Sequence, residues 1–369
     1  MSDAGAIAPR WIVSRGFDLT LFFGGAALSL IALALFALGT PIVALWWIWL
    51  LAFDGPHIGA AFTRTYLDRQ EWIRRPALLA GSLLTFVIGP LFLLIGIALR
   101  SDDPFLLYLG LATFYGYYHV VRQHYGFVAL YNAASREFDR HTLTRDRWTL
   151  YLGSWLPYAY FLLSHPRARV LIGIPASSGV AIVRSALVVA WCVTVAWFVW
   201  SNLHRRTFSQ PKVAYLLTTV TLHGAIYFVI SRFEPVYRAS TGPDQDFLLI
   251  SILIVIFHNV QYLGLVWFHN RNRYGTSTGH GVAQIVNSSP MFFLVACALF
   301  SSVIYLTFAC STGVFPGCAP LSDRRLGPVT WNQIGLCLWW GLALNHYFLD
   351  QKIWRIRGDQ ELKRNLRLA

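Results

Sequence analysis

Charged residues are scarce in this sequence, and lysine is almost missing. Only 13% of the 369 residues are charged and 56% are hydrophobic, and just three of the 30 basic residues, Lys212, Lys352 and Lys363, are lysine. A soluble domain has about 25% charged residues. The composition therefore excludes a soluble globular domain of this size and predicts an integral membrane protein.

Several motifs that mark common activities are also missing. The sequence contains no Gly-x-x-x-x-Gly-Lys-Ser/Thr phosphate loop, no Gly-x-Ser-x-Gly elbow, no Cys-x-x-Cys-His haem attachment and no His-Glu-x-x-His zinc helix. These absences argue against a P-loop nucleotidase, an α/β-hydrolase, a c-type cytochrome and a zinc protease of that type.

The formal net charge of +13 is the one compositional sign of a nucleic-acid partner. The basic residues, however, are spread through short segments between apolar runs and through the C-terminal end, without a strip of stacking aromatic side chains. We therefore interpret them as topology signals and expect no nucleic-acid partner.

Apolar segments of about the length that spans a bilayer occur ten times. About 20 helical residues cross ~30 Å of hydrocarbon. The ten segments are 19–39, 42–62, 77–98, 105–131, 148–164, 180–202, 213–231, 247–269, 290–310 and 331–350. Placing both termini in the cytoplasm puts 21 basic residues inside and 7 outside, as the positive-inside rule favours.

The sequence thus predicts an all-α, polytopic membrane bundle of about ten transmembrane helices. We expect a single domain over 1–369, with a cytoplasmic segment at 1–17 and a basic cytoplasmic tail at 351–369. Residues 1–15 lack the apolar core and cleavage site of a signal peptide, so the first span is expected to stay as an anchor. A bacterial inner membrane is the expected location.

The five cysteines divide into two sets. Cys192, Cys297 and Cys337 lie inside predicted spans and are interpreted as small apolar packing residues. Cys310 and Cys318 flank a predicted external loop. In an oxidising compartment these two can form a disulfide, and the sequence leaves open whether they do.

Histidine is the residue that points to chemistry. Seven of the eleven histidines fall within predicted spans, where ionisable groups are costly and usually face a ligand, a metal or a polar interior. The second, fourth, eighth and tenth spans run from outside to inside in this topology, and each carries histidine at a depth that converges near the cytoplasmic half of the bilayer. The expected metal ligands are His57, His124, His258 and His346.

Two acids accompany these histidines. Asp54 precedes His57 by three residues and Asp350 follows His346 by four, spacings that place carboxylate and imidazole on one helical face. Either carboxylate can orient its imidazole or itself complete a metal site. A hydrogen-bonded polar plug without a metal is the structural alternative.

Three further residues are candidates for catalysis. His119 and His124 are five residues apart, ~140° around a helix, so both reach one metal only if the helix is distorted or the site holds two ions. We interpret His119 as a second-metal ligand or proton relay. Arg122 can bind a substrate carboxylate or phosphate, or pair with an acid or snorkel. Tyr262, one turn after His258, can orient an oxidant or hydrogen-bond across helices.

Two short segments resemble known membrane oxygenases. Gly55-Pro56-His57-Ile58-Gly59-Ala60 resembles the Gly-x-Pro-His-Gly-Ala segment of the Brp/Blh family of β-carotene cleavage dioxygenases, and His124-Tyr125-Gly126 is similar to its His-Phe-Gly segment. The resemblance implies an all-helical membrane fold in which histidine-bound iron cleaves a polyene with dioxygen. His119 and His124 are also similar to the spaced histidine box of membrane desaturases, although the paired His-His boxes of that family are absent.

These observations favour an iron-dependent membrane oxidoreductase. We expect non-haem iron, mono- or dinuclear, with haem less favoured, and a lipophilic substrate such as a lipid or isoprenoid that enters from the membrane lipids. Dioxygen is the expected co-substrate, and a soluble electron donor is compatible with the basic cytoplasmic face. A proton- or metal-ion-coupled transporter and a non-catalytic scaffold remain the alternatives.

Overall fold

The computed structural model describes residues 10–165, 169, 173–175, 177–205, 208–232, 245–275, 278–311 and 324–368. Nearly all of them lie in helices. In the described part of the chain the only strands are β1 (Arg325–Leu326) and β2 (Val329–Thr330), which form an antiparallel pair. The predicted all-helical class is confirmed.

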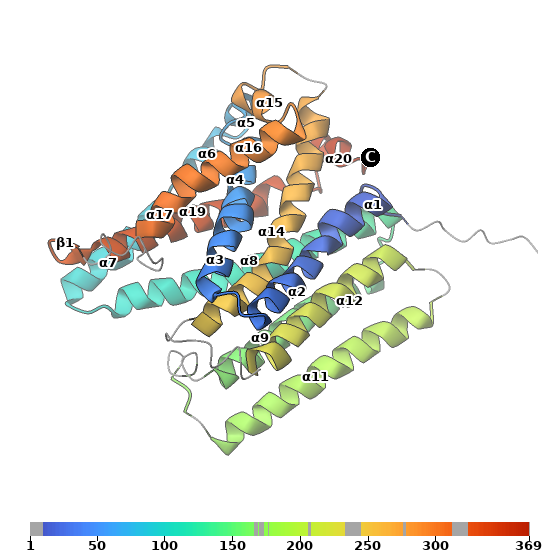
Figure 1. The fold of residues 1–369 in the computed structure, drawn as a ribbon. Coiled ribbons are helices and arrows are strands. Elements are labelled where there is room, and N and C mark those ends of the chain that lie inside the picture. The colour runs from blue at the N-terminus through green and yellow to red at the C-terminus, as the bar shows by residue number, and fades with distance from the viewer. Residues whose placement is uncertain are drawn as a thin grey trace, which may run out of the picture. The chain divides into compact units, whose positions relative to one another are not determined.

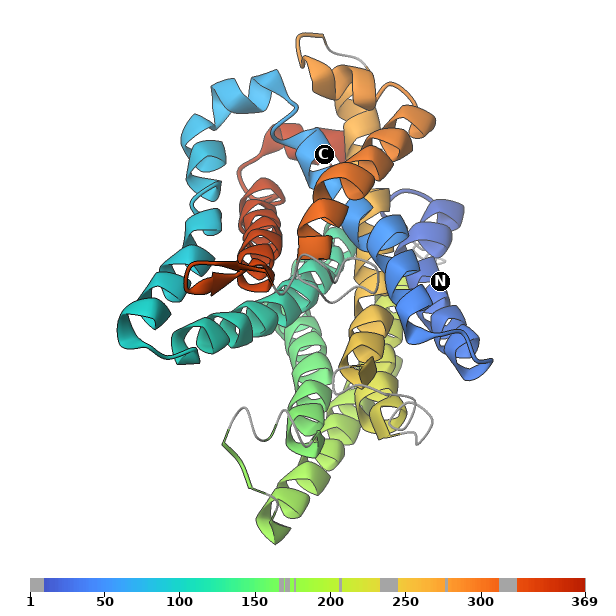
Figure 2. The same ribbon diagram turned by 60° about the vertical axis from the view of Figure 1, so that its left-hand side comes forward.

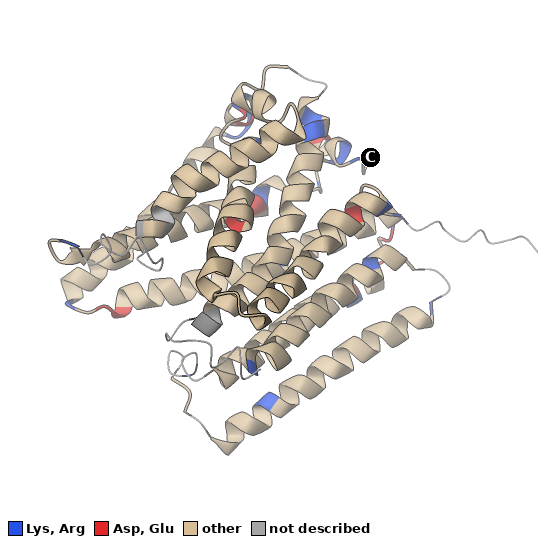
Figure 3. Ribbon diagram, viewed as in Figure 1, with Lys and Arg blue, Asp and Glu red and all other residues tan. Residues whose placement is uncertain are grey.

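Among the described residues, six helical segments are long and apolar enough to cross a membrane, judged by length and composition. They are Arg15–Ala37, Ile42–Arg64, Pro76–Leu99, Ser178–Leu203, Gln210–Arg232 and Leu248–Tyr274. In Figure 3, Lys and Arg are blue and Asp and Glu are red, and most of the length of the helices carries neither colour. The other four predicted spans fall on helices α8 (Asp103–Ser135), α9 (Arg140–Ser164), α16 with α17 (Pro290–Phe300 and Leu306–Ser311) and α19 (Trp331–Ile353).

The chain divides into two compact units. The first comprises residues 1–42 and 121–258, and the second comprises 43–120 and 259–369. Two long helices, α8 and α14 (Gln245–Tyr274), run through the boundaries without a break and belong to both units (Figure 1). Because these boundaries fall inside helices, the sequence carries no linker that marks them.

The first unit is a helical assembly in which α9 packs against α11 and α12 (Figures 1 and 2). Gly153 of α9 permits this approach, because a Cβ there would lie 2.4 Å from Cγ1 of Val220. The elements, besides the halves of α8 and α14, are α1 (Arg15–Phe17), η1 (Asp18–Phe23), α2 (Gly24–Ala37), α9, α11 (Ser178–Leu203), α12 (Gln210–Gly224), η3 (Ala225–Val229) and η4 (Ile230–Arg232).

A buried acid that the predicted first span left out lies near the start of the first long helix. The first long helix begins at Arg15 rather than at residue 19, so it includes Asp18, which is fully buried. Its carboxylate accepts hydrogen bonds from the backbone N–H groups of Ile12 and Val13 and from the Tyr131 hydroxyl. Asp18 therefore ties the N-terminal segment to α8 within the first unit.

In the second unit α19 packs against α7 and α16 packs against α4 (Figures 1 and 2). The elements, besides the halves of α8 and α14, are α3 (Ile42–Trp49), η2 (Leu50–Asp54), α4 (Gly55–Arg64), α5 (Arg69–Arg74), α6 (Pro76–Ser82), α7 (Thr85–Leu99), α15 (Val282–Val286), α16, η5 (Ser301–Tyr305), α17, β1, β2, α19 and α20 (Gln360–Asn365).

The cysteines differ in their bonding, along the division that their positions in the sequence suggested. Cys192, Cys297 and Cys337 are free thiols. Cys310 is disulfide-bonded. Cys318, the other cysteine of the pair considered above, lies outside the described residues.

The C-terminal helix α20 is held to the second unit by ion pairs. Asp359, which caps α20, lies 2.8 Å from the Arg75 guanidinium and 3.2 Å from that of Arg74. Glu361 lies 2.6 Å from Nη1 of Arg273. These contacts fasten the basic tail to α5 and to the end of α14.

We expect acid to loosen this tail. Burial raises the pKa of Asp359, but the Leu362 N–H and the guanidinium groups of Arg74 and Arg75 outweigh it, so the pKa lies below its ordinary value. A carboxyl with a lowered folded pKa adds stability above its unfolded pKa of about 4, and this stability is lost as pH falls through the folded pKa. Pepsin cleavage of the tail should therefore rise below about pH 4.

Asp359→Asn provides the control for this prediction, because it lacks the titrating group. Its tail should be cleaved readily at every pH in the range, and each comparison with the wild type is made at the same pH. Equal cleavage of both proteins at pH 5 would contradict a role for Asp359 in holding α20.

Candidate metal centre

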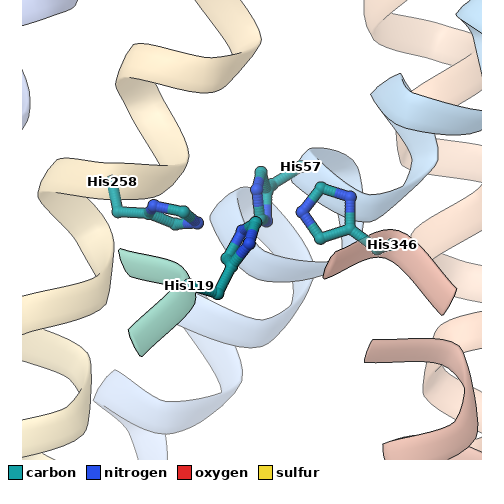
Figure 4. Close-up of side chains that lie close together, drawn as sticks. All are labelled: His57, His119, His258 and His346. Atoms are coloured by element: carbon teal, nitrogen blue, oxygen red, sulfur yellow. The ribbon is translucent and has the colours of Figure 1, made fainter. Parts of the chain in front are cut away.

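Four buried histidines from four helices point toward one another (Figure 4). Each offers one ring nitrogen, and these nitrogens all lie within 4.8 Å of one another. The four are His57 of α4, His119 of α8, His258 of α14 and His346 of α19. We refer to them as the four-histidine group.

A π-helical turn, η2, leads into the helix that carries His57. It ends at Asp54, and α4 begins at Gly55. A Cβ at Gly55 would lie 2.2 Å from Oγ of Ser301, so only glycine permits the close approach of η5. Ser301 in turn donates a hydrogen bond to the carbonyl of Leu51 at 3.1 Å. This packing holds the turn from which His57 extends, and π-helical turns are frequent at functional sites.

His57, His119 and His346 all belong to the second unit, and their rings are in contact. The centroid of His346 lies 4.3 Å from that of His57 and 5.0 Å from that of His119. Tyr347 stacks on His119 at 4.2 Å with an interplanar angle of 23°. The stacked ring restricts the orientation of His119. The contacts among the three imidazole rings restrict the other two in the same way.

His258 is the fourth member of the group. It is the last residue of the first unit, and Asn259 opens the second. The helix α14 continues through this point without interruption, and Asn259 is fixed in the second unit by hydrogen bonds with Trp49 and Asp54. The position of His258 therefore follows from the helix that carries it.

Asp350 lies beside two members of the group, on the turn of α19 that follows His346. Its Oδ2 is 3.5 Å from Nε2 of His346 and 3.9 Å from Nε2 of His119. Its Oδ1 accepts a 2.6 Å hydrogen bond from the Tyr262 hydroxyl. The Tyr262 ring meets His57 edge-on at 4.7 Å. Asp350 can thus orient two imidazoles or join them as a ligand, with Tyr262 holding its other oxygen.

The spacing of the ring nitrogens suits a metal ion. Bonds of about 2.0–2.1 Å from a metal to imidazole nitrogen place two ligand nitrogens at most about 4.2 Å apart. Nitrogens within 4.8 Å of one another can therefore reach one ion if each side chain shifts by up to about 0.7 Å. In addition, neither ring nitrogen of His346 has a hydrogen-bond partner in the described part of the chain, which is unusual for a buried imidazole.

Asp54 is not a member of the four-histidine group, although its spacing from His57 suggested a shared face. Its Oδ1 accepts a hydrogen bond from Asn259 at 3.2 Å, and its Oδ2 accepts one from the Tyr305 hydroxyl. Asp54 is the last residue of the π-helical turn η2, and both of its oxygens are occupied by side chains of α14 and η5. Here Asp54 joins η2, η5 and α14 within the second unit.

His119, rather than the expected ligand His124, joins the group from α8. The five-residue spacing turns the two side chains to different faces of one helix. His124 is fully buried in the first unit, where its Nδ1 lies 2.8 Å from the Tyr215 hydroxyl and its ring lies 5.7 Å from that of His223. His124 therefore contacts Tyr215 and His223 of the first unit and is not a member of the four-histidine group.

Arg122, expected near a substrate, is also part of the first unit. Its side chain is exposed and its Nη1 donates a hydrogen bond to the Tyr151 hydroxyl at 3.1 Å. The guanidinium lies 5.4 Å from the centre of the Tyr125 ring. The structure does not bring Arg122 to the four-histidine group.

Two tyrosines that contact the expected site residues were not identified from the sequence. Tyr347 stacks on His119, and Tyr305 bonds to Asp54. A sequence signal existed for the first, because Tyr347 directly follows His346 in a span. Tyr305 had none, because it lies in a span without any histidine or acid.

The arrangement can bind a transition metal through neutral imidazole nitrogens, with a carboxylate available at one side. Imidazole suits iron, copper, zinc and nickel, and a nearby carboxylate typically fixes the orientation of a metal-bound histidine. Comparisons with protein-family models, curated proteins and solved structures found no match to this chain.

Proposed function

We propose that this protein is a membrane-embedded oxidoreductase with a histidine-ligated metal, non-haem iron in particular. The observation that carries the proposal is the four-histidine group, in which one nitrogen from each of four helices lies within 4.8 Å of the others. A hydrogen-bonded plug without metal predicts partners for these nitrogens. The two ring nitrogens of His346, which have no hydrogen-bond partner among the described residues, favour metal binding instead.

His57, His119, His258 and His346 would hold the metal, and Asp350 would orient two of them or complete the set. Bound iron would supply redox chemistry and the activation of dioxygen. Tyr262 holds Asp350 in place by its hydrogen bond. The burial of all four histidines would exclude bulk water from reactive species. The resemblance of the segment around His57 to Brp/Blh oxygenases supports iron over zinc.

The substrate that this setting favours is a lipid or an isoprenoid. Many large apolar side chains on the long helices are exposed, for example Leu94, Val193 and Leu294, as expected of surfaces that face hydrocarbon. A lipophilic substrate can then approach from the membrane lipids. Dioxygen partitions into the same phase. A reaction of the desaturase type would further need a soluble electron donor at the basic face.

The proposal includes a topology of ten spans with both termini in the cytoplasm, in a bacterial inner membrane. It is supported by the six apolar helices and by the lopsided distribution of arginine. The four remaining spans would be α8, α9, α16 with α17, and α19, two of which carry members of the four-histidine group. Functional helices that face a polar centre are expected to be less apolar than helices that face lipid.

A second candidate function is a proton- or metal-ion-coupled transporter. The buried pair of His124 and His223 in the first unit favours it, because these rings are 5.7 Å apart and add ionisable groups beyond the four-histidine group. A transporter needs such groups along a path across the membrane. It would bind its ion transiently, whereas an enzyme retains its metal.

Elemental analysis of the purified protein tests the proposed function. We expect about one transition metal ion, or two if the site is dinuclear, per chain after chelator-free purification in a non-ionic detergent, with iron the most abundant. Reconstituted vesicles provide the second measurement. The absence of any retained metal, together with metal or proton flux across the vesicles, would reject the enzyme and support the transporter.

A further inference from the structure

A cavity of about 240 Å³ lies in the first unit, where α9, α11 and η4 meet. One arginine comes from α11 and another from η4, and the wall also includes two serine hydroxyls and an imidazole. The lining residues are Phe161, Ser164, His165, Arg184, Ser231 and Arg232. Among these residues there is no carboxylate, so the described wall is cationic and polar.

Tyr160 brings the two arginines together. Nη1 of Arg232 donates a 2.8 Å hydrogen bond to the Tyr160 hydroxyl. The guanidinium of Arg184 lies 5.6 Å from the centre of the same ring. In the described part of the chain, no carboxylate forms an ion pair with either arginine. Two like charges held at one tyrosine repel each other, and an anion between them would remove that cost.

The cavity also presents donors that have no partner among the described residues. Nε of Arg184 and Oγ of Ser164 are buried and have no hydrogen-bond partner in the described structure. Buried donors of this kind are normally satisfied. Arginine guanidinium groups match the geometry of tetrahedral oxyanions, to which they donate paired, charge-assisted hydrogen bonds.

The space fits a phosphate group with room for a substituent or water, since one water occupies about 30 Å³ of liquid volume. The cavity lies at the ends of α9 and of η4 and near the start of α11. In the ten-span topology these ends are at the outer surface of the membrane, at the level of lipid headgroups.

We propose that this cavity is a phosphate-binding site, in which Arg184 and Arg232 are the cationic ligands and Ser164 is a hydroxyl donor. The phosphate is that of a phospholipid headgroup or free inorganic phosphate. This site stands independently of the proposed metal centre, because it shares no residue with it.

Calorimetric titration of the full, delipidated chain in a phosphate-free maltoside detergent tests the proposal. The probes are inorganic phosphate, dihexanoylphosphatidylglycerol and, as a phosphate-free control, dihexanoylglycerol. Arg184→Gln and Arg232→Gln are each expected to weaken binding of the phosphate probe at least about tenfold. Arg325→Gln, a loss of the same charge at an exposed position in β1, should leave binding unchanged.

Saturable binding of inorganic phosphate identifies a free-anion site, and binding of the phospholipid alone identifies a headgroup site. Either outcome supports the proposal if the Arg184 and Arg232 variants no longer bind the same probe. Binding of neither phosphate probe overturns it, as does equal binding of dihexanoylglycerol or unchanged affinity in both arginine variants. Thermal unfolding in phosphate-free buffer verifies that each variant is folded.

Discussion

His346→Ala is expected to release the bound metal from the purified protein, while His124→Ala retains it. His346 lies between His57 and His119 in the four-histidine group, with ring centroids 4.3 and 5.0 Å away. Loss of a residue that hydrogen-bonds to a metal ligand lowers the affinity for the metal about 10–100-fold, and loss of a ligand itself should lower it more. Metal content after dialysis against a chelator, and oxidation of lipid extracts by reloaded protein, measure the effect.

The comparison with His124→Ala separates metal binding from packing. Both histidines are fully buried, so both substitutions remove the same volume from an interior and lower stability by similar amounts. Only His346 belongs to the four-histidine group. If both variants keep their metal, or if both lose it to the same extent, the group does not form the site that we propose.

Lys212→Met is expected to lower the free energy of unfolding by about 3–5 kcal/mol. The Lys212 side chain is fully buried in the first unit, and its Nζ lies 2.7 Å from Oδ2 of Asp146. It also donates hydrogen bonds to Asn132 and to Glu137. Methionine keeps most of the apolar stem but removes the cation from Glu137 and Asp146. Asp146 keeps its ion pair with Arg145 at 2.8 Å, so Glu137 bears most of the uncompensated charge, which is costly in an interior.

Sodium dodecyl sulfate titration in mixed micelles, followed by circular dichroism, measures this loss. Lys352→Met is the matched control because Lys352 is exposed near the end of α19, and it should change stability little. Adding Glu137→Gln to Lys212→Met should recover part of the loss, because it removes an orphaned charge. A Lys212→Met protein as stable as the control would show that the buried ion pairs contribute nothing net.

Much of the architecture follows from local properties that a sequence displays. In hydrocarbon every backbone hydrogen bond must be made within the helix itself, so long apolar segments predict helices without knowledge of their neighbours. Each expected span falls on one or more helices of the structure, and six helical segments of the described residues are long and apolar enough to cross a membrane. The first one begins earlier than expected, because Asp18 is buried by backbone donors and Tyr131 rather than left at the surface.

The histidines of the candidate centre were only partly predictable. Their number and their depth along separate spans led to His57, His258 and His346, which lie in the four-histidine group. Depth, however, does not say which face of a helix turns inward. His119 and His124 lie on the same helix at neighbouring depths, and only the packing of Tyr347 on one and Tyr215 near the other separates them.

The sequence by itself determined that the described chain is helical, with segments long and apolar enough to span a membrane and an unusual set of histidines in them, because composition and helix formation are local. Tertiary structure alone decided which imidazoles meet, that Asp350 accompanies them, and that Asp54 does not. The physical reason is that the partner of each side chain is set by packing between helices, as Asn259 and Tyr305 show for Asp54 and Tyr262 shows for Asp350. Such contacts depend on residues hundreds of positions away.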